Sequence, residues 1–381
     1  MALKYLYVPS AYKEATAYGV LPNAAAADLT FGRASNGSRI NKDKLIETES
    51  SNVPRLDYSS GSCPTLFTEL QVTNLVKESE NFTDSDWSKG NSTVTANATI
   101  DPQGGNNGFL VSLNTSQAYL SQAVSFLAEA NTFSVYLKSP TVAGTYPLNW
   151  YAANGGAHHR ELVNVTTEWK RFEINFTPTG LGGRFIYIGD NRGAIGETLS
   201  SVYAWGAQVE SSPKATSYIK TETSAVTRSA DTGIVSGDLS SYINSTEGVL
   251  EFKASRSALK NAVISLSSSL TSGDNSVSLG FTTSTTVLFH KILSSGANVI
   301  TQTPSVVSVD LTQMNVVKLK WKDGDFQAKI NDTVFTILEG GGSLPFAATL
   351  KYLRIGYPND TSQDFAGAIQ YIKVYDSASD F

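Results

Sequence analysis

The sequence predicts an all-β protein that contains antiparallel β-sandwich domains. Apolar and polar residues alternate in short runs along most of the chain, as at Phe133, Val135 and Leu137, and helical periodicity is almost absent. Gly, Asn and Pro separate these runs, as expected of turns between strands. Because 381 residues exceed what one core usually holds, we expect two or three domains.

The composition argues against several classes of protein. The net charge is −5 and no block of Lys or Arg occurs, so we expect no nucleic-acid partner. No apolar run approaches the ~18 residues of a membrane helix, so we expect no membrane insertion. Residues 1–8 are too short and too mixed for a signal peptide. Cys63 is the only cysteine, which excludes an intramolecular disulfide framework.

Residues 1–73 are predicted to form an N-terminal arm used for attachment and assembly. The segment has strand-like runs at residues 29–33 and 39–47, but it is too short for an independent core. We expect it to dock on the next domain or on sister subunits. It contains several large amphipathic side chains, which are enriched in interfaces. The residues assigned to assembly are Tyr5, Tyr7, Tyr12 and Tyr18.

Residues 74–222 are predicted to form the first sandwich. Its strands include Phe172, Ile174 and Phe176, which alternate with polar residues. Residues 223–231 are Thr/Ser/Ala-rich and are expected to be a linker. A second sandwich is predicted for residues 232–381, where Asp323-Gly324 lies between two alternating runs and predicts a hairpin. Trp169, Trp205 and Trp321 lie in strongly alternating runs and are predicted to be core residues.

Two segments combine aromatic residues with hydrogen-bonding side chains, a combination that suits sugars. Sugar rings stack on aromatic faces, and their hydroxyl groups need polar partners. The candidate ligand-binding residues are Trp150, Tyr151, Asn154, His158, Arg160, Tyr187, Asp190 and Arg192. Trp150 and Tyr151 point to opposite faces of a strand, so at most one of them faces a given groove. The alternative is that Trp150 is a core residue and the polar residues form a solvated loop.

The sequence predicts no catalytic residues, no cofactor and no metal site. It has no Gly-x-Ser-x-Gly elbow, no His-Glu-x-x-His motif and no phosphate-binding loop, so we expect no enzyme. His158 and His159 are adjacent, and a strand would direct them to opposite faces. A structural calcium is an alternative, but no spacing singles out its carboxylates. The acidic residues considered for it are Asp84, Asp86, Asp190 and Asp231.

Short blocks near the N-terminus occur in an order typical of one family. They are residues 28–35, 37–41, 45–47 and 52–58, followed by residues 73–75, 79–82 and Trp87. In this order they resemble the head-spike and fibre proteins of tailed bacteriophages, in which such a block precedes a carbohydrate-binding-type β-sandwich. Residues 226–231 resemble the exit from that sandwich in phage chains.

The two predicted sandwiches carry resemblances of their own. Residues 74–222 resemble jelly-roll carbohydrate-binding modules through Asn74, Leu75, Phe82, Trp87 and the closing residues 203–210. Residues 232–381 resemble laminin-G-like or concanavalin-like jelly rolls through the Trp-Lys-Asp-Gly sequence at residues 321–324 and the ending at residues 367–376. Both resemblances concern the fold more than the ligand.

Together the resemblances imply a structural protein on the virion surface, made in the cytoplasm of the bacterial host. It would be a head fibre, spike or decoration subunit that forms dimers or trimers and contacts capsid or tail proteins. Its sandwiches would bind bacterial surface glycans weakly and gain strength from multivalency. The alternatives are a tail-fibre receptor-binding protein and a capsid-stabilising decoration protein without a ligand. A polysaccharide hydrolase receives the least support.

Overall fold

The computed structural model describes most of the chain. The described residues are 2–125, 128–152, 158–178, 184–190, 192, 196–257, 262–282, 287–301, 305–306, 309–335, 338–339, 342–358 and 365–381. Among them, β-strands dominate, and the only helices are two 3-10 turns, Ala25–Ala27 and Ala378–Asp380. Strand pairs in both sandwiches are antiparallel. The all-β prediction is therefore confirmed. No helix in this part of the chain is long and apolar enough to cross a membrane.

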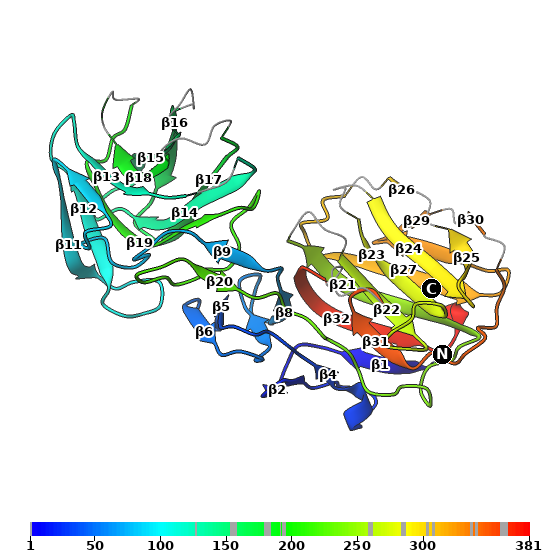
Figure 1. The fold of residues 1–381 in the computed structure, drawn as a ribbon. Coiled ribbons are helices and arrows are strands. Elements are labelled where there is room, and N and C mark those ends of the chain that lie inside the picture. Colours follow the sequence, from blue (N-terminus) through cyan, green and yellow to red (C-terminus); the bar gives the residue numbers. More distant parts are fainter. Residues whose placement is uncertain are drawn as a thin grey trace. The chain divides into compact units, whose positions relative to one another are not determined.

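The chain divides into two compact units (Figure 1). Unit 1 consists of residues 1–44, 48–70 and 229–381, and unit 2 of residues 45–47 and 71–228. In the sequence, unit 2 is thus an insertion between two parts of unit 1. Residues 74–222 all belong to unit 2, whereas residues 1–73 are no separate body and fall mostly in unit 1 together with residues 232–381. Residues 223–231 are divided between the units, with the break after Arg228.

Unit 1 is a sandwich of two large sheets. The first has the strand order β29-β28-β27-β21-β32-β8-β7, with β1 also on β32, and the second has β30-β25-β24-β23-β22-β31, with β26 on β24. The strands of the first sheet are β1 (Leu3–Tyr7), β7 (Arg55–Asp57), β8 (Thr65–Thr68), β21 (Glu247–Arg256), β27 (Asn315–Lys322), β28 (Gln327–Ile330), β29 (Thr333–Phe335) and β32 (Gly367–Tyr375). Those of the second are β22 (Ala262–Ser267), β23 (Ser276–Phe281), β24 (Val287–Ser294), β25 (Ala297–Thr301), β26 (Ser305–Val306), β30 (Leu338–Glu339) and β31 (Tyr352–Ile355).

Small strands complete unit 1. They are β2 (Tyr12–Lys13), β3 (Thr16–Ala17), β4 (Leu29–Thr30) and β5 (Gly37–Ile40), while β6 (Ile46–Glu49), the partner of β5, spans a boundary between the units. The expected Asp323-Gly324 hairpin is present between β27 and β28, where Lys320 pairs with Gln327 and Gly324 has a φ of 69°.

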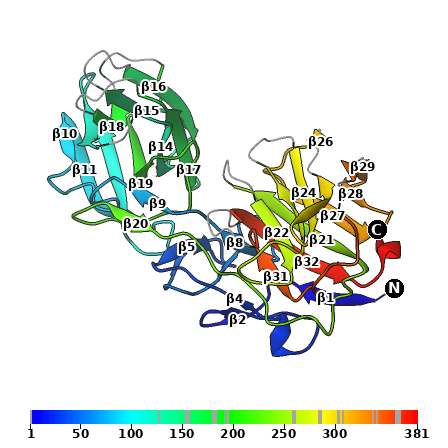
Figure 2. The ribbon, with the colours of Figure 1, turned by 45° about the vertical axis from the view of Figure 1, so that its right-hand side comes forward.

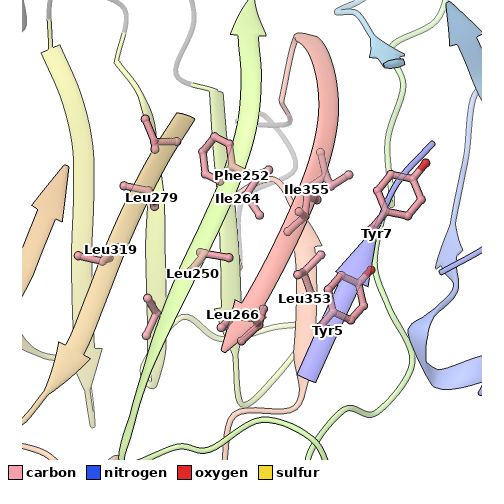
Figure 3. Close-up of a cluster of buried hydrophobic side chains, with 14 of the residues drawn as sticks. Tyr5, Tyr7, Leu250, Phe252, Ile264, Leu266, Leu279, Leu319, Leu353 and Ile355 are labelled. Atoms are coloured by element: carbon pink, nitrogen blue, oxygen red, sulfur yellow. The ribbon is translucent and has the colours of Figure 1, made fainter. Parts of the chain in front are cut away.

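Much of the predicted N-terminal arm is part of unit 1, whose core it shares with residues 229–381, so it is built into this sandwich and is not an arm docked on it. Strand β1 pairs with β32 from Leu3 opposite Tyr375 to Tyr7 opposite Ile372. Figure 3 shows Tyr5 and Tyr7 in the same apolar cluster as side chains of β21, β22 and β31. A short segment without a core of its own can bury apolar surface by extending an existing sheet.

The four tyrosines assigned to assembly therefore differ in accessibility. Tyr5 and Tyr7 are fully buried, so in this conformation their rings pack within the chain and are not accessible to a partner subunit. Tyr12 is half-buried and donates its hydroxyl hydrogen bond to Glu49 Oε1 at 3.1 Å. Tyr18 is 38% exposed, and of these four it is the one that a partner would reach most readily.

A buried ionic network holds three distant segments of unit 1 together. Arg33 Nη1 donates to Asp231 Oδ1 at 3.0 Å, Arg55 Nη2 donates to Asp231 Oδ2, and Arg55 Nη1 donates to Glu69 Oε2 at 2.6 Å. The side chains of Arg33, Arg55 and Asp231 are fully buried. Asp231 N also donates to Glu69 O at 2.9 Å, and Glu69 N donates to Asp231 Oδ2 at 2.7 Å. Asp231, expected in a linker, is therefore a fixed interior residue.

The tryptophans bear out part of the core prediction. Trp205 and Trp321 are fully buried. Trp169 lies in the turn before Lys170–Phe176, is only half-buried, and donates from its indole Nε1 to Ile100 O at 2.8 Å. The core prediction is thus confirmed for Trp205 and Trp321 and wrong for Trp169.

His290 makes the stability of unit 1 depend on pH. It lies on β24 opposite the core residue Leu279, so it points into the sandwich. It is fully buried, neither ring nitrogen has a hydrogen-bond partner among the described residues, and burial lowers its pKa from 6.5 to about 4. The unfolded chain therefore binds a proton below pH 6.5, whereas the folded chain does so only near pH 4.

We expect the free energy of unfolding of unit 1 to fall as the pH drops from 6.5 to 4. At pH 5, His290 accounts for about 2 kcal/mol of this loss in the free energy of unfolding, because one pKa unit corresponds to about 1.4 kcal/mol. Denaturant titrations read by hydrogen exchange in β23 and β24 at pH 7 and pH 5 measure this effect. His290→Leu is expected to remove this share of the pH dependence. Equal pH dependence of wild type and variant would contradict the assignment.

Candidate functional site

Unit 2 is a sandwich of two antiparallel sheets (Figures 1 and 2). One sheet has the order β10-β13-β18-β15-β16 and the other β11-β12-β19-β14-β17, while β9 pairs with β20. The strands are β9 (Val72–Asn74), β10 (Ser88–Gly90), β11 (Ser92–Thr99), β12 (Gly108–Leu113), β13 (Tyr119–Ala123), β14 (Asn131–Lys138), β15 (Gly144–Ala152), β16 (His158–Val165), β17 (Lys170–Phe176), β18 (Arg184–Asp190), β19 (Ser201–Glu210) and β20 (Val226–Arg228).

Trp150 belongs to the core between the two sheets, so its assignment to the binding face is wrong. It is 6% exposed and stacks on Phe176 of the opposite sheet, with ring centroids 4.7 Å apart and an interplanar angle of 18°. Successive side chains of a strand point to opposite faces. Asn149 and Tyr151, its neighbours on β15, therefore face away from the core.

The outer face of this sheet carries a row of aromatic rings. We call Tyr119, Tyr151, Phe185 and Tyr187 the ring row. Tyr151 lies opposite Phe185 in the pairing of β15 with β18. Ring centroids are 6.4 Å apart for Tyr151–Phe185, 6.4 Å for Phe185–Tyr187 and 6.1 Å for Tyr187–Tyr119. Tyr187 is 7% exposed and the other three rings are half-buried, so the row offers apolar surface that rigid strands hold in place.

A bulge in β18 directs Asp190 to the same face as the ring row. Ser121 pairs with Tyr187, but Tyr119 pairs with Asp190, so β18 has one extra residue between these two pairs. Gly189 provides this geometry with a φ of 82°. A Cβ atom at Gly189 would lie 2.2 Å from Tyr146 Oη, so close packing also requires glycine there.

Gly189→Ala is expected to lower the free energy of unfolding of unit 2 by at least about 2 kcal/mol, because the strained φ and the contact with buried Tyr146 add up. Thermal unfolding followed by calorimetry measures the loss. Gly324→Ala in unit 1 is the control for strain alone, since its φ is 69° and nothing lies within 4 Å of the added Cβ. We expect it to lose about 1 kcal/mol. Equal losses in the two variants would argue against the packing role of Gly189.

Asp190 is the centre of a polar network beside the ring row. Its side chain is fully buried and accepts hydrogen bonds from Asn149 Nδ2 at 3.0 Å and from Arg192 Nε and Nη2, both at 2.9 Å. Arg160 Nη2 lies 3.4 Å from Asp190 Oδ2 and also donates to Arg192 O. Burial raises the pKa of Asp190, but the hydrogen bonds and charge of Arg192, with the charge of Arg160, outweigh it and lower the pKa below 3.8.

Arg192 connects this network to the ring row. Its guanidinium carbon lies 4.4 Å from the ring centroid of Tyr119 and 5.0 Å from that of Tyr187. These are cation–π distances. The Arg192 side chain remains 36% exposed.

The structure brings five of the eight candidate residues together on this face: Tyr151, Arg160, Tyr187, Asp190 and Arg192. Trp150 points the other way, Asn154 lies outside the described residues, and for His158 the structure describes only the backbone, at the start of β16. Tyr119, Asn149 and Phe185 were not among the candidates. Strand periodicity could have identified two of them. Asn149 and Phe185 each lie two residues before a candidate, and residues two apart in a strand point to the same face.

Within the described residues, no group of three or more His, Cys, Asp or Glu side chains is arranged to hold a metal ion. Asp190 and Asp231, two of the acidic residues considered for calcium, each face guanidinium groups. The expectation of no cofactor stays a prediction.

No family model and no curated protein matches the chain. Among solved structures it is similar to the N-terminal CBM22-1–CBM22-2 tandem domain of Xyn10C from Paenibacillus barcinonensis, with 10% identity and a TM-score of 0.30 over 81% of this chain and 99% of that chain. It is also similar to domains LG4-5 of the mouse laminin α1 chain, with 9% identity and a TM-score of 0.26 over 68% of this chain and 86% of that chain. Likeness at this level identifies neither a family nor a ligand.

Proposed function

We propose that the chain is a non-catalytic glycan-binding protein and that the ring row of unit 2 holds the sugar. The observation that carries this proposal is the side-by-side placement of four rings on one sheet face, next to Asn149 and Arg192. Apolar C–H faces of sugar rings stack on aromatic faces, and polar side chains nearby orient the hydroxyl groups.

The way the site is built also favours binding over catalysis. Its rings come from strands β13, β15 and β18, so little conformational freedom is lost when a ligand binds. Asp190 is a carboxylate on this face, but its oxygens are engaged by Arg192 and Asn149. A carboxylate whose pKa is held low is poorly suited to act as a general acid.

The setting we propose is the surface of a phage virion, with the protein as a head fibre or spike. Support comes from the sequence blocks at residues 28–58, whose order resembles phage head-spike and fibre proteins. Many copies on one particle would raise the strength of weak sugar contacts by orders of magnitude.

A second function, capsid stabilisation without a ligand, is favoured by one observation. Arg33 and Arg55, which lie in the blocks that carry the phage resemblance, are structural residues inside unit 1. On this alternative, particles that lack the protein would lose stability and still adsorb normally to host cells.

The experiment that tests the proposed function is binding of the multimerised protein to immobilised surface polysaccharide from host cells, read by biolayer interferometry. We expect reversible binding that free polysaccharide competes, without release of reducing ends. Absence of binding to cells and to their isolated polysaccharide would contradict the glycan proposal. Release of reducing ends would instead indicate a hydrolase.

A further inference from the structure

The ring row crosses its sheet in one direction. Its rings come from β15, β18 and β13, which are successive neighbours in the sheet. Tyr151 of β15 lies opposite Phe185, Tyr187 follows two residues later on β18, and Tyr119 comes from β13. The centroids of neighbouring rings are between 6.1 and 6.4 Å apart. The row is therefore an extended line of rings that does not turn back on itself.

Such a line suits a chain of sugars better than a single sugar. A sugar ring and an aromatic ring are similar in size, so each aromatic ring offers a stacking surface to about one sugar unit. The distance between neighbouring rings of the row is of the same order as the distance between successive sugars in an extended polysaccharide. A single sugar would leave the rest of the row uncovered, whereas about four consecutive sugars would cover all of it.

The tilt of the rings argues against a flat ligand. The interplanar angle is 31° between Tyr151 and Phe185, 40° between Phe185 and Tyr187, and 77° between Tyr187 and Tyr119. The surface of a crystalline polysaccharide is flat, so it needs coplanar rings to stack on several of them at once. A single dissolved chain rotates about its glycosidic bonds and can therefore follow rings that are turned relative to one another.

The two ends of the row differ in their chemistry. At one end, Tyr151 and Phe185 are half-buried rings. At the other end, the guanidinium group of Arg192 lies over the rings of Tyr119 and Tyr187. This group is planar and carries hydrogen-bond donors, so a sugar at this end would meet polar and aromatic surface together. A ligand that uses both ends must span the row.

We propose that the ring row binds a stretch of about four consecutive sugars in a single dissolved polysaccharide chain, and neither a lone sugar nor a flat crystalline surface. This inference rests on the proposed glycan function and adds the length and the form of the ligand. The strands that carry the rings hold the line in place before the chain binds, so little conformational freedom of the protein is lost.

The test is a series of ligands of increasing length. The probes are oligosaccharides made by partial hydrolysis of the polysaccharide that binds the full chain most tightly, separated by their number of sugar units, together with the monosaccharide. Isothermal titration calorimetry gives each Kd. We expect the affinity to rise about three- to tenfold with each added sugar, as an aromatic contact contributes, and to level off at about four units. Crystalline cellulose, the flat probe, should retain no protein in a sedimentation assay.

A variant at one end of the row shows which rings set the length. Tyr151→Ala removes the end ring and leaves Tyr187 and Tyr119 next to each other. We expect its affinity to level off at about three units, with long oligosaccharides weakened and the shortest ones unaffected. Tyr203→Ala, on the other sheet of unit 2, should leave the whole series unchanged. Because the wild-type series uses the unaltered protein, it decides the question even if Tyr151→Ala folds poorly.

The outcomes are distinguishable. A monosaccharide that binds as tightly as the longest oligosaccharide would overturn the extended site and leave the glycan function intact. Retention on crystalline cellulose would overturn the argument from the ring tilt. An equal loss at every length in Tyr151→Ala would overturn the assignment of one sugar to each ring. No binding of any polysaccharide would overturn the proposed function together with this inference.

Discussion

Replacing Asp231 by asparagine is expected to lower the free energy of unfolding of unit 1 by about 3–5 kcal/mol. The carboxylate of Asp231 lies between Arg33 and Arg55, and all three side chains are fully buried. Without it, Arg33 and Arg55 each lose an ion pair with Asp231, while the ion pair of Arg55 with Glu69 remains. A buried charge that has lost its partner costs far more than the net gain of the intact pair.

Hydrogen-exchange mass spectrometry in denaturant measures this loss unit by unit, with peptides of β21 and β32 reporting on unit 1. Peptides of β14 and β19 in unit 2 serve as the internal reference and should change little. The matched control is Asp376→Asn, which breaks the partly exposed ion pair with Lys4 at 3.2 Å and should cost less than about 1 kcal/mol. Similar small losses for both variants would show that the network contributes little to stability.

Tyr151→Ala combined with Tyr187→Ala is expected to weaken polysaccharide binding about 100-fold, since aromatic anchors commonly contribute 2 kcal/mol or more to an interface. The two changes remove neighbours of Phe185 on either side and so break the ring row. Binding of multimerised protein to immobilised host polysaccharide gives the affinities.

Tyr203→Ala is the control for this pair. Tyr203 is a half-buried tyrosine on β19, whose neighbours Val202 and Ala204 point into the core, so it lies on the outer face of the other sheet. We expect its affinity to match that of wild type. If Tyr203→Ala binds as weakly as the double variant, the sugar site is not the ring row.

Strand periodicity predicted much of the fold because it reports burial directly. The alternation at Phe133, Val135 and Leu137 is that of β14, and the Asp323-Gly324 signal marks a real hairpin. The same periodicity left the orientation of Trp150 and Tyr151 open, because it tells that the two residues face apart but not which face is the core. Only the pairing with β18, and the stacking of Trp150 on Phe176, decides this.

The pairing of strands that lie far apart in the chain could not be predicted from the sequence. Residues 1–73 look too short for a core, and nothing local shows that β1 adds to β32 more than 360 residues later in the chain. Arg33, Arg55 and Asp231 lie in the short sequence blocks that resemble phage proteins. Their burial in one network could not be read from those blocks, because unit 2 separates Asp231 from the two arginines in the sequence. Likewise, the bulge at Gly189, and not any motif, puts Asp190 beside Tyr187.

Hydroxyl-radical footprinting of the full chain, with and without host polysaccharide, tests the central claim most directly. Mass spectrometry reads the oxidation of each aromatic side chain. If the ring row binds sugar, the half-buried rings of Tyr119, Tyr151 and Phe185 become protected while that of Tyr203 stays equally reactive. Protection confined to unit 1, or unchanged reactivity of these three rings with polysaccharide bound, would contradict the claim.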